Sequence, residues 1–146
     1  MIKNLQAFLY REIPLTKDMG LEMREFSSEL LLASAPLDEN INDKGSVFGG
    51  SSSALMIITA WSLIKLNCQK HGITSDIVIH KNETTWNKAL YDKPIIKASF
   101  KKEYNFNNIK AALKRSKLQR IECIIELQDE QTNIYSTMTT KYVIIP

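Results

Sequence analysis

The residues best suited to do chemistry lie in one short segment around two adjacent glycines. Asn40 and Asn42 precede the run Phe48-Gly49-Gly50-Ser51, and a strongly apolar stretch begins at Ala54. This pattern predicts a tight glycine turn that leads into the N-terminus of a buried helix. Free backbone N–H groups at such a terminus can stabilise the negative oxygen that develops on a carbonyl under attack. The alternative is that the glycines only make the turn and the serines only cap the helix.

Other catalytic and metal-binding patterns are absent from the sequence. It contains no Cys-x-x-Cys, no His-Glu-x-x-His, no phosphate-binding loop and no Gly-x-Ser-x-Gly. With only two histidines, a multi-histidine metal centre is excluded, and neither a metal nor another cofactor is expected. Cys68 and Cys123 are far apart and each lies in an apolar run, which predicts reduced core thiols in a cytoplasmic protein.

Length and composition indicate an ordinary globular protein. With 146 residues, 44% of them hydrophobic and 24% charged, the chain predicts a single domain over residues 1–146. The stretch Gly45–Ile64 carries no charge, but only Ala54–Ile64 is densely apolar, which is too short to span a membrane. The net charge of +3 gives no reason to expect a nucleic-acid partner.

The charge is unevenly distributed along the chain. The segment Lys97–Arg120 holds eight cations and only one anion, Glu103, so it carries +7 and the rest of the chain carries −4. We call Lys97–Arg120 the basic segment. It could contact phosphates or an acidic partner, or it could be a solvated surface.

The elements that must position these residues follow from their periodicity. We expect one buried helix, capped at Ser51, Ser52 or Ser53, that runs to Lys70 with Gly72 at its C-terminus. The other expected elements are a helix over the first dozen residues that Pro14 stops, strands over 22–33, 76–86 and 95–104, a short helix from Asn107 or Asn108 to Lys117, and a hairpin of 118–127 with 132–145. This order predicts an α+β fold, an antiparallel sheet wrapped around one long buried helix, with sheet edges that a partner chain would extend.

The segment around the glycines resembles a known family. The resembling residues are Ala35-Pro36-Leu37, Asn40-x-Asn42-x-x-Gly45-Ser46-x-Phe48-x-Gly50-Ser51, Trp61, Ile77-Val78-Ile79 and Asp92. They are similar to the thioesterase domain of the YiiD C-terminal type, which has the hot-dog fold. The resemblance implies a homodimer, or a tetramer of two such dimers, that hydrolyses thioesters of coenzyme A (CoA) or of acyl-carrier protein.

The resemblance also implies roles for individual residues. The N–H of Gly49 or Gly50 would polarise the thioester carbonyl, and Asn40 or Asn42 would orient water or substrate. Phe48 and Ser51 would contact the substrate, although capping is the simpler role for Ser51.

Two groups of more distant residues are also candidates for substrate binding. Trp61 and Trp86 would line an acyl tunnel, with ordinary core or interface packing as the alternative. The cations Lys101, Lys102, Lys110, Lys114 and Arg115 would form part of a phosphate-attracting entrance, with a solvated helix face as the alternative.

The general base is the point at which the sequence departs from a related hot-dog group. That group has His-Gly-Gly at the turn and a carboxylate seven residues after the second glycine, where this chain has Phe48 and Ile57. Asp43 and Glu83 are the candidate bases that remain. The alternatives are that Asp43 caps a turn and that Glu83 lies on a solvated strand face.

Two other functions compete with hydrolysis. A non-catalytic module that binds or senses acyl-CoA needs no base and fits the missing carboxylate. A dehydratase acting on hydroxyacyl thioesters needs a histidine opposite an acid, and His80 is the only candidate for that role.

Overall fold

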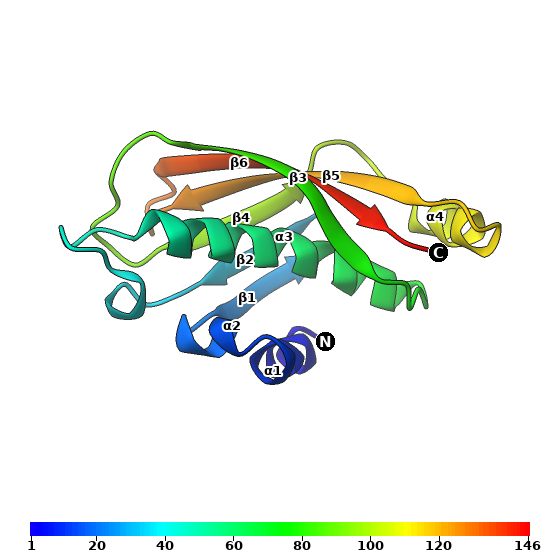
Figure 1. Cartoon of the computed structure of the whole chain (residues 1–146), viewed down its shortest axis with the longest axis horizontal. Helices are drawn as coiled ribbons and strands as arrows, with labels where there is room; N and C mark the ends of the chain where they lie inside the picture. Colours follow the sequence, from blue (N-terminus) through cyan, green and yellow to red (C-terminus); the bar gives the residue numbers. More distant parts are fainter.

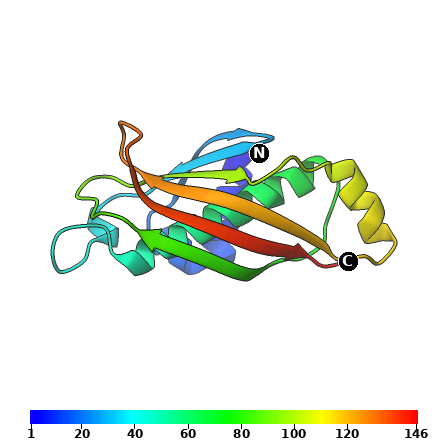
Figure 2. The same cartoon turned by 90° about the horizontal axis from the view of Figure 1, so that it is seen from above.

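A six-stranded antiparallel sheet wraps around one long helix (Figures 1 and 2). The structure is a computed structural model that describes all residues, 1–146. Along the sheet the strands follow the order β1-β2-β4-β5-β6-β3. This α+β arrangement confirms the predicted hot-dog fold. The elements are α1 (Ile2–Glu12), α2 (Pro14–Asp18), β1 (Glu22–Ser27), β2 (Leu30–Ser34), a 3-10 turn (Asp38–Asn40), α3 (Gly49–Lys70), β3 (Ile77–Trp86), β4 (Ile95–Phe100), α4 (Phe106–Lys114), β5 (Gln119–Gln128) and β6 (Ile134–Ile144).

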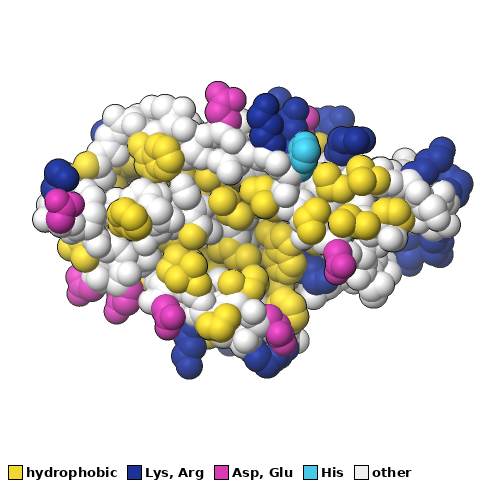
Figure 3. All heavy atoms as spheres, in the orientation of Figure 1, with side chains coloured by type: hydrophobic (Ala, Val, Ile, Leu, Met, Phe, Trp, Pro, Cys, Tyr) yellow, Lys and Arg dark blue, Asp and Glu magenta, His cyan; other side chains and the backbone are white.

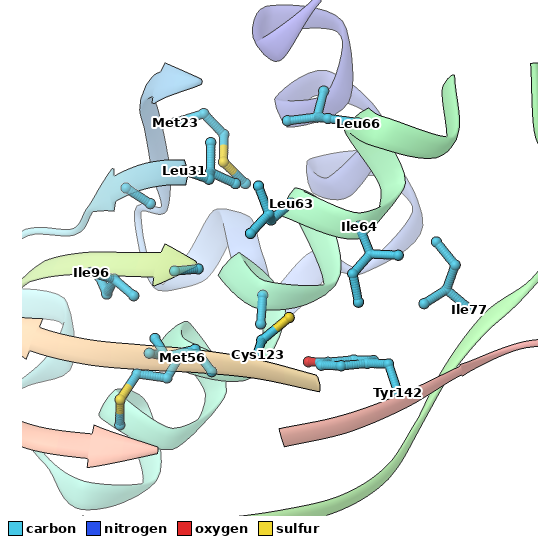
Figure 4. Packing of buried hydrophobic residues seen from close by; sticks show 14 of the residues in the cluster. Met23, Leu31, Met56, Leu63, Ile64, Leu66, Ile77, Ile96, Cys123 and Tyr142 are labelled. Atoms are coloured by element: carbon cyan, nitrogen blue, oxygen red, sulfur yellow. The ribbon is translucent and has the colours of Figure 1, made fainter. Parts of the chain in front are cut away.

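The core lies between α3 and the inner face of the sheet (Figure 4). Leu63 and Ile64 of α3 are fully buried, as are Leu31 of β2, Ile96 of β4 and Cys123 of β5. Burial of each large aliphatic side chain contributes about 1.5–3 kcal/mol, so this layer holds α3 firmly in place. The expected buried helix is confirmed over Ser62–Cys68, where only Lys65 is not buried, whereas nearer its N-terminus one face of α3 is only half-buried.

Two predicted elements differ from the structure. The single strand expected over 22–33 is a hairpin, because the chain reverses at Ser28 and Glu29 and β1 pairs antiparallel with β2. The short helix is capped by Asn105, not by Asn107 or Asn108: its Oδ1 accepts a hydrogen bond from the N–H of Asn108 at 3.0 Å. The predicted strand over 95–104 ends at Phe100, because the chain turns there to reach this cap.

The two edges of the sheet are protected differently. At β1, the helix α1 packs alongside, and the N–H of Met23 donates to Oε1 of Gln6 at 2.7 Å. At β3, nearly every residue is exposed, including Val78, Ile79 and Trp86. The ten-residue strand β3 is therefore a long bare edge of the kind that pairs readily with another strand.

The helices were also compared with what a membrane span requires. None of them combines the length and the apolar character needed to cross a lipid bilayer.

Candidate functional site

The helix α3 begins at the glycines themselves. Its first residue is Gly49, and Phe48 stands at the N-cap with an extended backbone and no side-chain hydrogen bond. The prediction that a serine caps this helix is therefore wrong. Because the helix starts before the serines, Ser52 lies in the first turn, where its hydroxyl donates back to the carbonyl of Gly49 at 2.9 Å.

Three backbone N–H groups at this helix start have no acceptor within the chain, namely those of Gly49, Gly50 and Ser51. The N–H groups on either side are used: Phe48 donates to the carbonyl of Asn40 at 2.7 Å, and Ser52 donates to the carbonyl of Phe48 at 2.9 Å. The positive end of the helix dipole adds to the field of the free donors. The turn can therefore bind a carbonyl oxygen and stabilise the negative charge that develops on it.

Asn40 fixes the loop that precedes the turn. Its side chain is 1% exposed, and its amide nitrogen donates to the carbonyls of Met19 at 2.9 Å and Pro36 at 2.8 Å. The amide oxygen is buried and has no partner in the chain. Both donors of this amide are thus committed to holding the loop, whereas its acceptor is free.

Asn42 closes the same loop through its own side chain. Its amide oxygen accepts from the N–H groups of Lys44 at 2.9 Å and Ser46 at 3.1 Å, and its amide nitrogen donates to Oγ of Ser46 at 2.9 Å. A bridge between Ile41 and Val47 completes this closed turn. Asn42 therefore shapes the loop.

Two aromatic side chains frame the glycines. The ring of Phe48 lies over Gly50, where an added Cβ would come within 2.4 Å of its Cε2 atom. On the other side, Nε1 of Trp86 donates to Oγ of Ser52 at 3.0 Å. Phe48 and Trp86 are each about half exposed, at 54% and 53%, so both rings are open to a ligand at the turn.

An apolar stripe continues from the turn along α3. Ala54, Ile57, Ile58 and Trp61 are half-buried and lie on one helix face, because they are three or four residues apart. We call these four residues the α3 stripe. Figure 3 shows hydrophobic side chains across the middle of the face that carries α3. Trp61 is fixed by a hydrogen bond from its Nε1 to the carbonyl of Ile77 at 2.9 Å.

Neither candidate base is held against the glycine turn. The side chain of Asp43 is 81% exposed and pairs with Lys44 at 3.4 Å. Glu83 is exposed on β3, opposite Thr139, while its neighbour Thr84 lies opposite the buried Met138. Since side chains alternate along a strand, Glu83 points to the outer face of the sheet, away from α3.

The basic segment lies at the other end of the molecule from the glycine turn. The helix α3 has 22 residues and is therefore about 33 Å long. Lys110 of α4 contacts its C-terminal end, with Nζ 3.1 Å from a Cβ built on Gly72. Lys114 and Arg115 follow at the end of α4, where Figure 3 shows dark blue side chains gathering. Within one chain, these three cations and the glycine turn are not brought together.

The buried ionisable groups do not offer another nucleophile. Burial raises the pKa of Cys68 to about 11 and that of Cys123 to about 12, so both stay protonated thiols at neutral pH. Burial also raises the pKa of Tyr142, whose hydroxyl donates to the carbonyl of Ile57 in the middle of α3. No three His, Cys, Asp or Glu side chains gather in a way that could hold a metal ion.

The contact between Ser52 and Trp86 is the feature of the site that sequence reasoning missed. Ser52 was expected only as a cap, and Trp86 either as a tunnel wall or as a packing residue of the core or interface. Their spacing of 34 residues gives no local signal, because the contact exists only once β3 has returned antiparallel to α3. The alternation of β3 gave no hint either, because the bulge between Ile79 and Lys81 shifts it by one residue before Trp86.

Solved structures share this fold over nine-tenths or more of their length. A protein from Shewanella oneidensis, described as a "putative thioesterase", has a TM-score of 0.90 at 23% identity, with 99% of this chain and 97% of that chain covered. A protein of unknown function from Chlorobaculum tepidum has a TM-score of 0.88 at 23% identity, covering 98% and 93%. A thioesterase from Haemophilus influenzae has a TM-score of 0.79 at 14% identity, covering 99% and 90%. At these identities the likeness shows the fold.

Family membership comes from the sequence itself. Residues 2–146 match the family described as "Putative thioesterase (yiiD_Cterm)", which is almost the entire chain. The match agrees with the fold and with the free N–H groups at the start of α3. The chain belongs to the YiiD C-terminal family of thioesterases.

Proposed function

We propose that the protein hydrolyses thioesters of CoA or of acyl-carrier protein at the start of α3. The observation that carries this proposal is the set of three free backbone N–H groups at Gly49, Gly50 and Ser51, next to an apolar surface. The thioester carbonyl oxygen binds there, and its developing charge is stabilised by donors that need no reorganisation. The acyl chain extends along the α3 stripe, and Phe48 and Trp86 flank the reacting carbon.

The attacking water needs a base and an orienting group. Asp43 is the better candidate base, because it belongs to the same loop as the glycine turn, whereas Glu83 points to the outer face of the sheet. Asn40 acts as a positioning residue, since its amide holds the loop through Met19 and Pro36. Asn42 closes the loop around Ser46 and supports the same geometry.

The working unit in this proposal is a homodimer. Two copies pair through β3, because its bare ten-residue edge presents unpaired backbone groups next to exposed apolar side chains. Pairing of two such dimers into a tetramer stays the alternative assembly. A cytoplasmic location fits the two buried free cysteines.

The test is a hydrolysis screen over short, medium and long acyl-CoA thioesters, with release of free thiol as the signal. We expect turnover by the wild type and a large loss of kcat in Asp43→Ala, with Glu83→Ala close to wild type. Equal rates for all three proteins would remove both acids as bases. No turnover on CoA or carrier-protein thioesters would refute the proposed reaction.

A second candidate function is a non-catalytic module that binds acyl-CoA. The specific observation in its favour is that no carboxylate is held against the free N–H groups, since Asp43 is 81% exposed and Glu83 faces away. Saturable binding of acyl-CoA in calorimetry, with no thiol released over the same period, would select it.

A further inference from the structure

We propose that the cations that bind the substrate's phosphates come from the second copy of the chain, so that the basic segment of one subunit faces the glycine turn of the other. This inference rests on the proposed thioesterase function and on pairing through β3. It names CoA thioesters as the substrate, because the ligand must carry phosphates that reach cations outside its own subunit.

The strand β3 runs antiparallel to α3. Trp86, at the end of β3, bonds to Ser52 at the start of α3, whereas Ile77, at the beginning of β3, bonds to Trp61 farther along the helix. The strand therefore runs back from the C-terminal half of α3 to the glycine turn. Lys110 and the rest of α4 lie beyond the opposite end of α3 (Figure 2).

A pair of β3 strands from two subunits has two-fold symmetry. When two copies of one strand pair antiparallel around a two-fold axis, the end of each strand lies beside the beginning of the other. Trp86 of one subunit then lies near Ile77 of the partner subunit. The end of the molecule that carries the glycine turn is thereby placed beside the partner's end that carries α4.

The charges at the centre of β3 favour one position of the two-fold axis. Directly opposite residues of an antiparallel pair point to the same face of the sheet, so the axis must pass through a residue paired with its own copy. An axis at Lys81 would oppose two lysines, and an axis at Glu83 would oppose two glutamates. An axis at Asn82 instead places Lys81 opposite Glu83 of the partner subunit, twice, with all four side chains on the outer face.

The surroundings of Lys81 within its own chain favour the same axis. On β6 its cross-strand neighbour is Lys141, a like charge, and Lys81 forms no ion pair. Glu83 lies opposite the uncharged Thr139 and is also unpaired. Each subunit thus presents one unpaired cation and one unpaired anion at matching positions on its bare edge.

This dimer brings positive charge to the site. Lys110, Lys114 and Arg115 form no ion pair with any carboxylate of their own chain. Most of the +7 of the basic segment is thus free to attract an anion. A CoA thioester bound with its carbonyl at Gly49 or Gly50 has its phosphates at the far end of the pantetheine arm, where the partner's α4 lies.

The test uses mixed dimers of two differently damaged subunits, prepared by co-expression with two affinity tags. One subunit carries Gly50→Val, which blocks the glycine turn. The other carries Lys110→Gln, Lys114→Gln and Arg115→Gln together. We expect the homodimer of the triple variant to show a KM for acyl-CoA about tenfold or more above wild type at low salt, with kcat unchanged.

The mixed dimer is expected to recover the wild-type KM with about half the wild-type kcat per dimer, since its one open glycine turn faces an intact basic segment. A mixed dimer that keeps the raised KM of the triple variant would overturn the inference, because the cations would then act on their own subunit's site. An unchanged KM in the triple variant itself would also overturn it.

Two controls separate this result from other causes. The variant Lys3→Gln, Lys17→Gln, Arg24→Gln removes three exposed cations elsewhere and should leave KM unchanged. Acyl-pantetheine, which lacks the nucleotide phosphates, should show the same KM with wild type and triple variant. A raised KM for acyl-pantetheine would mean that the three substitutions act on the fold and not on the phosphates. Absence of wild-type turnover would instead refute the proposed function.

Discussion

The two glycines at the start of α3 should respond very differently to the same added methyl group. At Gly50, a Cβ would lie 2.4 Å from Cε2, 3.0 Å from Cζ and 3.1 Å from Cδ2 of Phe48, so the ring must move. At Gly49, the nearest atom would be Nε1 of Trp86 at 3.6 Å, an ordinary contact. Gly49→Ala is therefore a matched control for Gly50→Ala.

The expected magnitudes follow from these contacts. In the first helical turn, replacing glycine by alanine gains about 0.5–1 kcal/mol of folding free energy, so Gly49→Ala should be neutral or slightly stabilising. In Gly50→Ala the gain is offset by displacement of a ring that is 54% exposed and can swing aside, and the net stability change should stay under about 1 kcal/mol. The methyl group and the displaced ring both encroach on the approach to the free N–H groups.

Activity should thus separate the two variants where stability does not. Loss of one well-placed oxyanion donor costs a factor of about 10²–10³ in kcat, and a partial displacement should cost about tenfold to a hundredfold in Gly50→Ala. Gly49→Ala should stay within about threefold of wild type, because its N–H remains accessible. The measurements are kcat and KM for acyl-CoA hydrolysis together with thermal melting. Equal activity in the two variants would refute the assignment of the oxyanion site to this turn.

Further predictions concern the dimer edge, the core and the thiols. Lys81→Glu and Glu83→Lys should each raise the dissociation constant of the dimer about tenfold in sedimentation experiments, because each variant places like charges opposite each other twice across the axis. The double variant, which exchanges the two charges, should restore the wild-type dissociation constant. A double variant that dimerises no more tightly than the single variants would exclude the axis at Asn82. Tyr142→Phe removes the hydrogen bond to the carbonyl of Ile57 and should lower the free energy of unfolding by about 1–2 kcal/mol in urea titrations. The matched control Tyr91→Phe, at an exposed tyrosine, should change nothing, and equal effects would contradict the role of this bond. Burial raises the pKa of Cys123 from 9.0 to about 12, so the thiol ionises first in the unfolded chain and its contribution to stability is lost as the pH rises above 9. Urea midpoints of wild type and Cys123→Ala should therefore converge between pH 9 and 11, and parallel curves would argue against a buried neutral thiol.

The central helix and the positions of most strands along the chain were predictable because their signals are local. The run from Ala54 to Leu66 is dense in apolar residues over a helical length, which is typical of a largely buried helix, and Gly72 has the φ of +69° expected after a helix end. The hairpin at Ser28 and Glu29 escaped prediction because its turn contains no glycine, proline, asparagine or aspartate. Its register depends on pairing of β2 with β4, which is remote in sequence.

The candidate site was predictable in its glycines but not in its surroundings. Periodicity could not tell that Glu83 points outward, because the bulge between Ile79 and Lys81 shifts the alternation of β3 by one residue. Periodicity could not place Lys110 either. This residue lies at the C-terminal end of α3 because of the way β4 and β5 cross the helix. These are properties of the tertiary arrangement, and a linear sequence does not display them.

The uncapped start of α3 argues that this turn serves binding at some cost to stability. A serine or aspartate at the position of Phe48 would satisfy one of the free N–H groups and add about 1 kcal/mol to helix stability. Two other hydrogen bonds hold the turn: the N–H of Phe48 donates to the carbonyl of Asn40, and Nε1 of Trp86 donates to Oγ of Ser52. Neither bond uses the N–H groups of Gly49, Gly50 and Ser51. Phe48→Ser should therefore raise the melting temperature and lower hydrolysis together, because the new hydroxyl competes with the substrate's carbonyl oxygen for the same donors. Phe48→Leu, which keeps an apolar side chain and adds no acceptor, is the control that should leave the melting temperature near wild type. A Phe48→Ser protein that is more stable and equally active would show that the free donors have no part in the chemistry.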